Sequence, residues 1–258
     1  PEIALAEERI ETTDDIAVFG EAVYRYSDNL SFTAGLRYSR NSLKLDYVSR
    51  FVLDDNEQII AGEKLTEKII PKIAMRYEWS PDMQAYAQIS VGYRVGGINI
   101  NTPLEALAAA EPDDFELAEF NSRAFQSDEL INYEIGLKSY WFNRNLSLNV
   151  AGFYVDWFDI QSDQIGPSGL PFVTNVGRAR SLGYEVEFSA RLFSGFELRG
   201  SFFWNDSQLT EGNSFLGADP GDRLPTIPKN TASIAALYQF NLGPNWRSAI
   251  AADYAFTG

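Results

Sequence analysis

The segment Tyr184-Glu185-Val186-Glu187-Phe188-Ser189-Ala190-Arg191-Leu192 alternates apolar and polar residues without interruption. Successive side chains of a β-strand point to opposite faces, so this segment predicts a strand with one apolar and one polar face. A strand that crosses a bilayer needs about 9–11 residues, and the segment is long enough to do so. An apolar face toward lipid and a polar face toward water are typical of a transmembrane β-barrel.

The same alternation recurs along the chain and predicts about ten strands. The expected strands cover residues 16–26, 30–48, 65–79, 83–97, 129–142, 146–163, 173–193, 196–209, 230–241 and 246–257. Several exceed the roughly 5–6 residues that are usual in globular proteins. Their length favours a membrane barrel over a soluble β-sandwich.

The connections between the expected strands alternate between short and long. The short ones are residues 27–29, 80–82, 143–145, 194–195 and 242–245, and the long ones cover roughly 49–64, 98–128, 164–172 and 210–229. Outer-membrane barrels combine short periplasmic turns with long extracellular loops. Aromatic residues flank the short turns, and a second group lies about one strand-length away, as expected for the two aromatic girdles of a barrel. Ordinary core aromatics are the alternative reading.

Composition excludes several other classes of protein. The 258 residues include no Cys and no His, which rules out disulfides and argues against a zinc site or a Cys/His nucleophile. The formal net charge of -15 argues against nucleic-acid binding. The sequence contains no run of 18 apolar residues, so no transmembrane helix is predicted. We therefore expect neither an enzyme nor a cofactor.

Several short segments follow one another in an order that resembles the barrel of TonB-dependent outer-membrane receptors. They are residues 17–21 with 35–38, 86–99, 134–139, 153–154 with 159–161, 183–187 and 224–229. The most specific is Gly92-Tyr93-Arg94-Val95-Gly96-Gly97-Ile98-Asn99. It resembles the family segment Gly-Phe-Arg-x-Gly-Gly-x-Asn, with Tyr93 in place of Phe.

The resemblance implies an all-β, antiparallel up-and-down transmembrane barrel. Transporters of this kind have about 22 strands and a plugged lumen. Residues 1–258 would supply about ten of these strands. The plug domain and the final strands would not belong to this chain. The implied function is active uptake of a scarce ligand at the outer membrane of a Gram-negative bacterium, energised by the TonB complex through the plug. A ferric siderophore, a cobalamin-like compound or a glycan would be the ligand, and outer-membrane lipid would surround the barrel.

Charged residues that share the polar phase of the strands are candidates for contact with a plug or a ligand. An Arg on the lipid face at mid-depth would cost about 2–4 kcal/mol, which assigns such residues to the interior. Those retained as candidates on the wall are Arg37, Glu185, Glu187 and Arg199. Arg94 and Asn99 join them because they flank paired glycines where a strand meets a long loop. The alternative is a solvated wall with mutual charge pairs.

Two long loops carry possible motifs. A short helix could start at Thr102 and run through Ala110, within a loop rich in Asp and Glu. This loop lacks the Asp/Asn spacing of a calcium-binding loop, so it is interpreted as solvated. The 210–229 loop lacks the Lys-Ser/Thr ending of a phosphate loop.

Three functions remain to be compared. They are active import, a passive porin or adhesin barrel, and a soluble β-sandwich or enzyme with a β-scaffold. Strand length, the alternation of short and long connections, and the two groups of aromatic residues count against a soluble β-sandwich or enzyme. The presence of a plug domain would distinguish active import from a passive porin or adhesin barrel.

Overall fold

The computed structural model describes residues 5–51, 57–101, 123–166, 169–212, 218–225 and 227–258. Ten long strands form one antiparallel sheet in which each strand pairs with its neighbours along the chain. In order, they are β1 (Leu5–Arg25), β2 (Leu30–Phe51), β3 (Glu57–Ser80), β4 (Met83–Arg94), β7 (Asp128–Trp141), β8 (Leu146–Phe158), β11 (Arg178–Phe193), β12 (Phe196–Glu211), β13 (Asn230–Asn241) and β14 (Arg247–Thr257). The expected all-β, up-and-down arrangement is confirmed.

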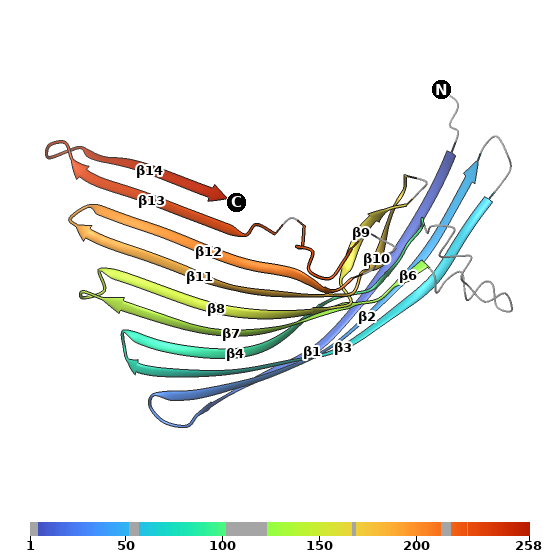
Figure 1. Ribbon diagram of the computed structural model, residues 1–258, viewed down its shortest axis with the longest axis horizontal. Coiled ribbons are helices and arrows are strands. Elements are labelled where there is room, and N and C mark those ends of the chain that lie inside the picture. Colours follow the sequence, from blue (N-terminus) through green and yellow to red (C-terminus); the bar gives the residue numbers. More distant parts are fainter. Residues whose placement is uncertain (1–4, 52–56, 102–122, 167–168, 213–217, 226) are drawn as a thin grey trace.

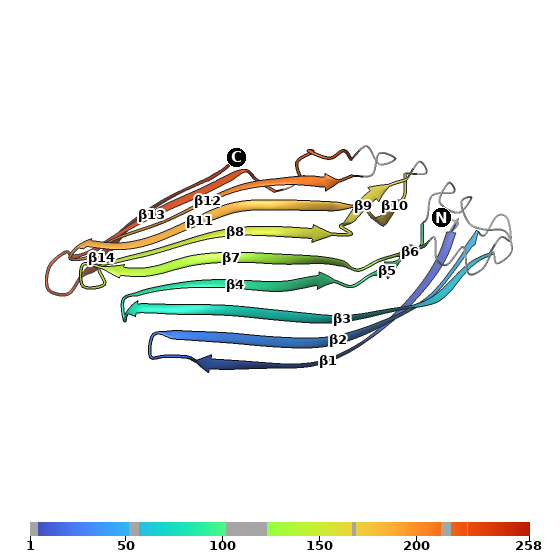
Figure 2. The same ribbon diagram turned by 60° about the horizontal axis from the view of Figure 1, so that its bottom comes forward.

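Within the described residues the ten strands form a single curved layer (Figures 1 and 2). The short turns lie at one end and the longer connections at the other. Within the described residues β1 and β14 form the two edges and do not pair, so the sheet is not closed. The described ranges contain no helix that is long and apolar enough to cross a membrane.

The long connections contain two further pairs of short strands, called here hairpins. They are β5 (Gly97–Ile98) with β6 (Ala124–Phe125), and β9 (Gln161–Ile165) with β10 (Pro171–Asn175). The expected strands 146–163 and 173–193 are present but were drawn too long, because each joins a strand of the sheet to an arm of the β9–β10 hairpin. The break occurs at Asp159 and Gly177, which have φ of 52° and 114°. Positive φ turns the chain out of the sheet.

Strands at the loop end also differ in length from the expectation. β1 begins at Leu5 and β3 at Glu57, well before the expected residues 16 and 65. β4 ends at Arg94, short of the expected 97, because Gly97 belongs to β5. The β3–β4 pairing ends at Lys72 and Ser90, whereas β1–β3 stay paired far beyond that point. Beyond this point the loop-end parts of β1, β2 and β3 bend away from the rest of the sheet as a separate ribbon (Figure 2). This ribbon is called here the extension.

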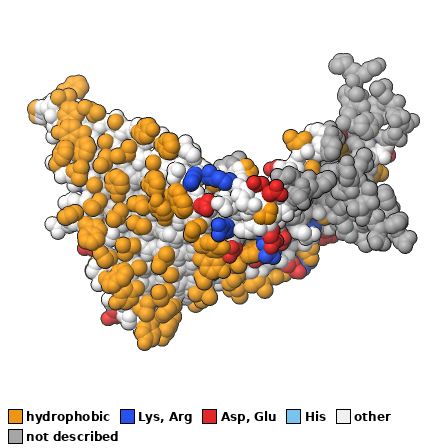
Figure 3. All heavy atoms as spheres, in the orientation of Figure 1, with side chains coloured by type: hydrophobic (Ala, Val, Ile, Leu, Met, Phe, Trp, Pro, Cys, Tyr) orange, Lys and Arg blue, Asp and Glu red, His pale blue; other side chains and the backbone are white. Residues whose placement is uncertain are grey.

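Strand register keeps apolar residues beside apolar residues across the sheet. One row runs Met75, Ala87, Ile135, Gly152, Tyr184 and Trp204. The next row, on the opposite face, includes Gln88, Glu134, Phe153, Gly183 and Asn205. Figure 3 shows the apolar face, on which hydrophobic side chains cover the part of the sheet nearer the short turns. These side chains are exposed, among them Ile135 at 66%.

The apolar band ends at charged residues toward the loop end. On this face the first charged residues are Asp14, Arg40, Glu67, Asp156, Arg180 and Asp206, on β1, β2, β3, β8, β11 and β12 respectively. The apolar runs below them, such as 69–79 on β3 and 182–192 on β11, have the length of a bilayer crossing, about 9–11 residues. The structure therefore has a band of the right height for hydrocarbon, bounded by charge.

Beyond the band, buried apolar residues lie on the other face. Leu45 and Tyr47 of β2 and Ile60 of β3 pack with Ile98 of β5 in a small core, with Ile100 beside them. The face of β2 that is polar inside the band is therefore apolar in the extension. This core seats the β5–β6 hairpin against the extension.

Candidate ligand-binding site

A cavity of about 540 Å³ lies at the loop end, on the side of the sheet that is polar inside the band. Strands β1 and β2, the chain between β4 and β5, and the hairpins β5–β6 and β9–β10 all contribute to it. Its polar lining residues include Arg9, Glu11, Thr13, Asn41, Asn99, Gln161 and Asp163. Segments that are distant in the sequence thus converge on one concave surface, as ligand sites commonly do.

Asn41 leaves one hydrogen-bond acceptor unused in this lining. Its side chain is only 3% exposed, and its Nδ2 donates to Asp15 Oδ1 at 2.7 Å. Its Oδ1 is buried and has no hydrogen-bond partner among the described residues. Leaving a buried acceptor unpaired costs about 1–3 kcal/mol. Because this oxygen is sealed from solvent, a molecule in the cavity would reach it only after the Asn41 side chain turned toward the cavity.

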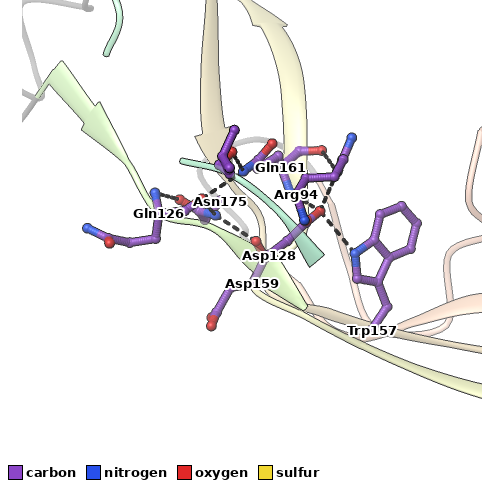
Figure 4. Close-up of polar contacts among 8 residues, drawn as sticks. Arg94, Gln126, Asp128, Trp157, Asp159, Gln161 and Asn175 are labelled. Atoms are coloured by element: carbon purple, nitrogen blue, oxygen red, sulfur yellow. Dashed lines mark hydrogen bonds and ion pairs between the residues drawn. The ribbon is translucent and has the colours of Figure 1, made fainter. Parts of the chain in front are cut away.

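Asp128 organises the junction between the wall and the loops (Figure 4). The carboxylate is almost fully buried and forms an ion pair with the Arg94 guanidinium, whose Nε lies 2.8 Å from Oδ2. Trp157 Nε1 donates to the same Oδ2 at 3.0 Å, and the Arg94 guanidinium lies over the Trp157 ring. Strands β4, β7 and β8 are thus joined where they leave the sheet.

A second set of contacts fixes the β9–β10 hairpin over this junction (Figure 4). Gln161 Nε2 donates to the carbonyls of Val95 and Gln126 at 2.8 and 2.9 Å. Asn175 Oδ1 accepts from the Gln126 amide at 2.8 Å, and its Nδ2 donates to the Asp159 carbonyl at 2.6 Å. The hairpin is therefore held by side-chain amides that bind backbone groups.

Asn99 binds the two hairpins together. Its side-chain amide both donates to the Val173 carbonyl and accepts from the Val173 amide, each at 2.7 Å. Gly96 and Gly97 precede it, and a Cβ at either position would lie within 2.5 Å of Phe125. The paired glycines thus permit close packing of the loop.

Two ionisable groups of the extension have shifted pKa values. Burial raises the pKa of Tyr47, the hydrogen bond to Ser49 opposes this shift, and the hydrogen bond to Glu7 adds to it. Burial lowers the pKa of Lys64. Lys64 Nζ donates to Gln126 Oε1 at 2.8 Å and so joins β3 to the loop that carries β6.

The structure does not bring the six candidate residues together. Asn99 lines the cavity, and Arg94 lies beside it in the junction described above. Arg37, Glu185 and Glu187 lie within the band on the polar face. Arg199 lies near the short β11–β12 turn and pairs with Glu197 at 2.7 Å. Their contact with a ligand or a plug stays a prediction.

Within the band, the charged candidates differ in their partners. The Arg37 guanidinium lies over the Phe19 ring, 5.8 Å from its centroid. The carboxylates of Glu185 and Glu187 have no hydrogen bond or ion pair among the described residues. Their neighbour Glu134, in contrast, accepts from Tyr86 at 2.6 Å and from Gln88 at 3.1 Å.

The sequence reasoning missed Asn41, Asp128, Gln161 and Asn175. Asn41 could have been noticed because it lies where the alternation of β2 changes face. The other three only show their role once the hairpins are placed. The expected helix from Thr102 to Ala110 and the carboxylates around it lie outside the described residues, and the described part holds no cluster of acidic side chains suited to a metal ion.

Comparison with known proteins supports the interpretation as a receptor barrel. Residues 6–258 match the family model described as TonB dependent receptor-like, beta-barrel. The pesticin receptor of Yersinia enterocolitica is 25% identical over 224 residues, and the metal-pseudopaline receptor CntO of Pseudomonas aeruginosa is 21% identical over 233 residues. These matches cover 84% and 90% of this chain but only 29% of each relative.

Solved structures show the same fold. The ferric yersiniabactin uptake receptor FyuA from Yersinia pestis superposes with a TM-score of 0.73 at 18% identity, over 98% of this chain and 38% of that chain. The ferric-catecholate import receptor Fiu from E. coli K12 gives a TM-score of 0.68 at 14% identity, over 91% of this chain and 33% of that chain. The relatives are receptors rather than enzymes, as the sequence led us to expect.

Proposed function

Because this chain belongs to the family of TonB-dependent receptor β-barrels, we propose that it forms part of the wall of an outer-membrane transporter for a scarce ligand. The chain spans about a third of the relatives it matches. Residues 1–258 would contribute ten strands of a barrel of about 22, and the plug domain and final strands would lie elsewhere in the protein. The single observation that carries the proposal is the cavity at the loop end with the unpaired Asn41 carbonyl.

The orientation in the membrane follows from the loops. Short turns face the periplasm in outer-membrane barrels, and longer loops face the outside. With this orientation the cavity opens toward the cell exterior, where a ligand arrives first. The charged residues above the apolar band would lie at the level of the outer headgroups.

The ligand class we favour is a metal chelate. The similar proteins include receptors for metal-pseudopaline and ferric yersiniabactin. The cavity combines Arg9 with Glu11 and Asp163, so a ligand with both polar and charged groups fits better than an apolar one. An N–H or O–H group on the ligand would satisfy Asn41 Oδ1 once that side chain turned toward the cavity. A cobalamin-like compound or a glycan are the other ligands to be tested.

Energy would come from TonB through the plug. Glu185 and Glu187 support this part of the proposal, because they are acidic, lie on the polar face inside the band and have no partner among the described residues. Basic groups of a plug or of a passing ligand would pair with them. Arg37 and Arg199 would contact the plug or line the path of the ligand less directly, because the wall already gives them partners.

A growth experiment tests the function with the full-length protein. A deletion strain would receive the wild-type gene and be supplied with one metal chelate, cobalamin or glycan at a time as the only source of that nutrient. We expect rescue by one chelate class only, and loss of rescue when TonB is also deleted. Uptake that persists without TonB would instead indicate a passive porin.

A variant of the cavity sharpens the test. Asn41→Leu removes the free acceptor and should weaken binding of the rescuing chelate by roughly tenfold, the loss of one buried hydrogen bond. Ser201→Ala, on the same face near the short turns, serves as the control variant. Equal binding by both variants would contradict the assignment of the cavity.

A further inference from the structure

The apolar face is hollowed at one place inside the band. Ala87 and Gly152 are small residues in a row that otherwise holds Met75, Ile135 and Tyr184. They leave a hollow of about 670 Å³ that runs across several strands. The adjacent row supplies its other side with Ile89, Tyr133, Tyr154 and Leu182.

Gly152 is not needed for packing within the chain. A Cβ at this position would come no closer than 3.9 Å to any neighbour, the Gly183 carbonyl oxygen. On the same face, Gly200 lies under the Phe188 ring, which is 2.5 Å from the position of a Cβ. Gly200 is thus required by its neighbour, whereas Gly152 keeps open a space that the described residues leave unfilled.

A cation lies at the loop-end border of the hollow. Arg180 lies two residues before Leu182 on the same face of β11, toward the loop end, and belongs to the charged border of the band. It is exposed, and its side chain forms no hydrogen bond or ion pair among the described residues. Asp156 is its cross-strand neighbour and accepts the Tyr154 hydroxyl at 2.8 Å, but no ion pair joins its carboxylate to Arg180. Arg180 is therefore available to an anionic group at the membrane surface.

We propose that the hollow holds one acyl chain of a phosphate-bearing lipid, with the phosphate paired to Arg180. The proposal rests on the proposed function, because it needs the apolar face to border a bilayer. An apolar hollow followed by a cation at the edge of the band matches the order of chain and head group in such a lipid. A partner protein would instead need a larger surface of complementary shape.

Specificity would come from fit and charge rather than from the hydrophobic effect. A lipid chain is already in hydrocarbon, so moving it into the hollow removes no apolar surface from water. Close packing against Ile135 and the tyrosine rings, and the charge-assisted contact with Arg180, are the terms that distinguish a bound lipid from a bulk one. Both can be removed by single substitutions.

Native mass spectrometry of the full-length protein in detergent tests the proposal. The probes are phosphatidylglycerol and a diacylglycerol with the same acyl chains. We expect one phosphatidylglycerol to bind, and we expect Arg180→Gln to weaken its binding roughly tenfold while leaving diacylglycerol binding unchanged. Gly152→Phe should fill the hollow and abolish the bound state of both probes.

Matched control variants exist for each change. Gly20 lies on the apolar face with nothing within 4 Å of a Cβ, so Gly20→Phe adds the same ring away from the hollow. Arg40→Gln removes a charge from the same border on β2. Binding that is unchanged in Gly152→Phe would overturn the proposal, as would capture of a protein in place of a lipid. Growth on the chelate should be normal in Gly152→Phe, so the failure of this inference is distinguishable from the failure of the transport function.

Discussion

The two halves of strand β2 follow opposite alternations, although they belong to one uninterrupted strand. In residues 30–38 the even positions are apolar, as at Phe32 and Leu36, and the odd positions are polar or small. In residues 41–47 the odd positions are apolar at Leu43, Leu45 and Tyr47. The pairing with β1 and β3 runs through both halves without a register shift. The change of face therefore lies in the sequence and not in a bulge.

The difference shows which surroundings each half is built for. Leu36 is 57% exposed and Leu45 is 1% exposed, yet both are leucines of the same strand. An exposed apolar face suits a hydrocarbon solvent, while a buried apolar face with polar residues outside suits water. The change occurs at Arg40, the charged residue that ends the apolar band on β2. Four predictions test this comparison.

The largest effect is expected from shortening a leucine in each half. Leu45→Ala should cost about 2–5 kcal/mol of unfolding free energy, because it opens a cavity among packed residues. Leu36→Ala should cost less than about 1 kcal/mol, since lipid chains are as apolar as leucine and can fill the space. Urea titration of the full-length protein in lipid vesicles measures both. Equal costs for the two variants would break the comparison.

The second effect is expected from placing an arginine on the even face of each half of β2. Leu36→Arg should cost about 2–4 kcal/mol at the middle of a bilayer. Ser42→Arg lies on the same side of β2, beyond the border, where the new cation can still pair with Glu63. We expect its cost to stay within about 0.5 kcal/mol, as for most surface substitutions. The same vesicle titration applies, and a costly Ser42→Arg would move the membrane border outward.

The junction around Asp128 gives the third effect. Asp128→Asn weakens the ion pair with Arg94 and should cost about 1–3 kcal/mol locally. Arg94 is half exposed, which places the effect toward the lower end. We expect faster hydrogen exchange in β9–β10 and no change in the band half of β2. Arg144→Gln, which removes the exposed pair with Asp82 at the short-turn end, is the control variant. Faster exchange across the whole sheet would show that the junction supports the wall rather than the loops.

Much of the band could be predicted from the sequence because one physical rule governs it. Between hydrocarbon and water, alternation with period 2 is enough to locate strands, and the short turns locate their ends. The break between β8 and β9 could not be found in this way, because Val155, Trp157 and Ile160 continue an apolar-rich run through Asp159. Only the positive φ of Asp159 and Gly177 separates the hairpin from the sheet.

The candidate site was predictable only in part. Arg94 and Asn99 were identified from a local motif, and the structure gives both of them contacts that build the loop end. Asn41 lies where the alternation of β2 changes face, but the cavity that it lines exists only once the hairpins are placed. Side-chain amides such as Gln161 and Asn175 bind backbone groups distant in sequence, and such pairs have no fixed spacing.

The smallest effect concerns the ionisation of Tyr47 in the extension. Burial raises its pKa above the usual value of 10.0. A raised pKa in the folded state favours the neutral phenol, so its contribution to stability is fully present below pH 10 and is lost as the pH rises through the folded pKa. The difference in absorbance at 295 nm between wild type and Tyr47→Phe should therefore appear only above pH 10. A difference at lower pH would show that water reaches this side chain, and then the odd face of β2 would not be buried in the extension.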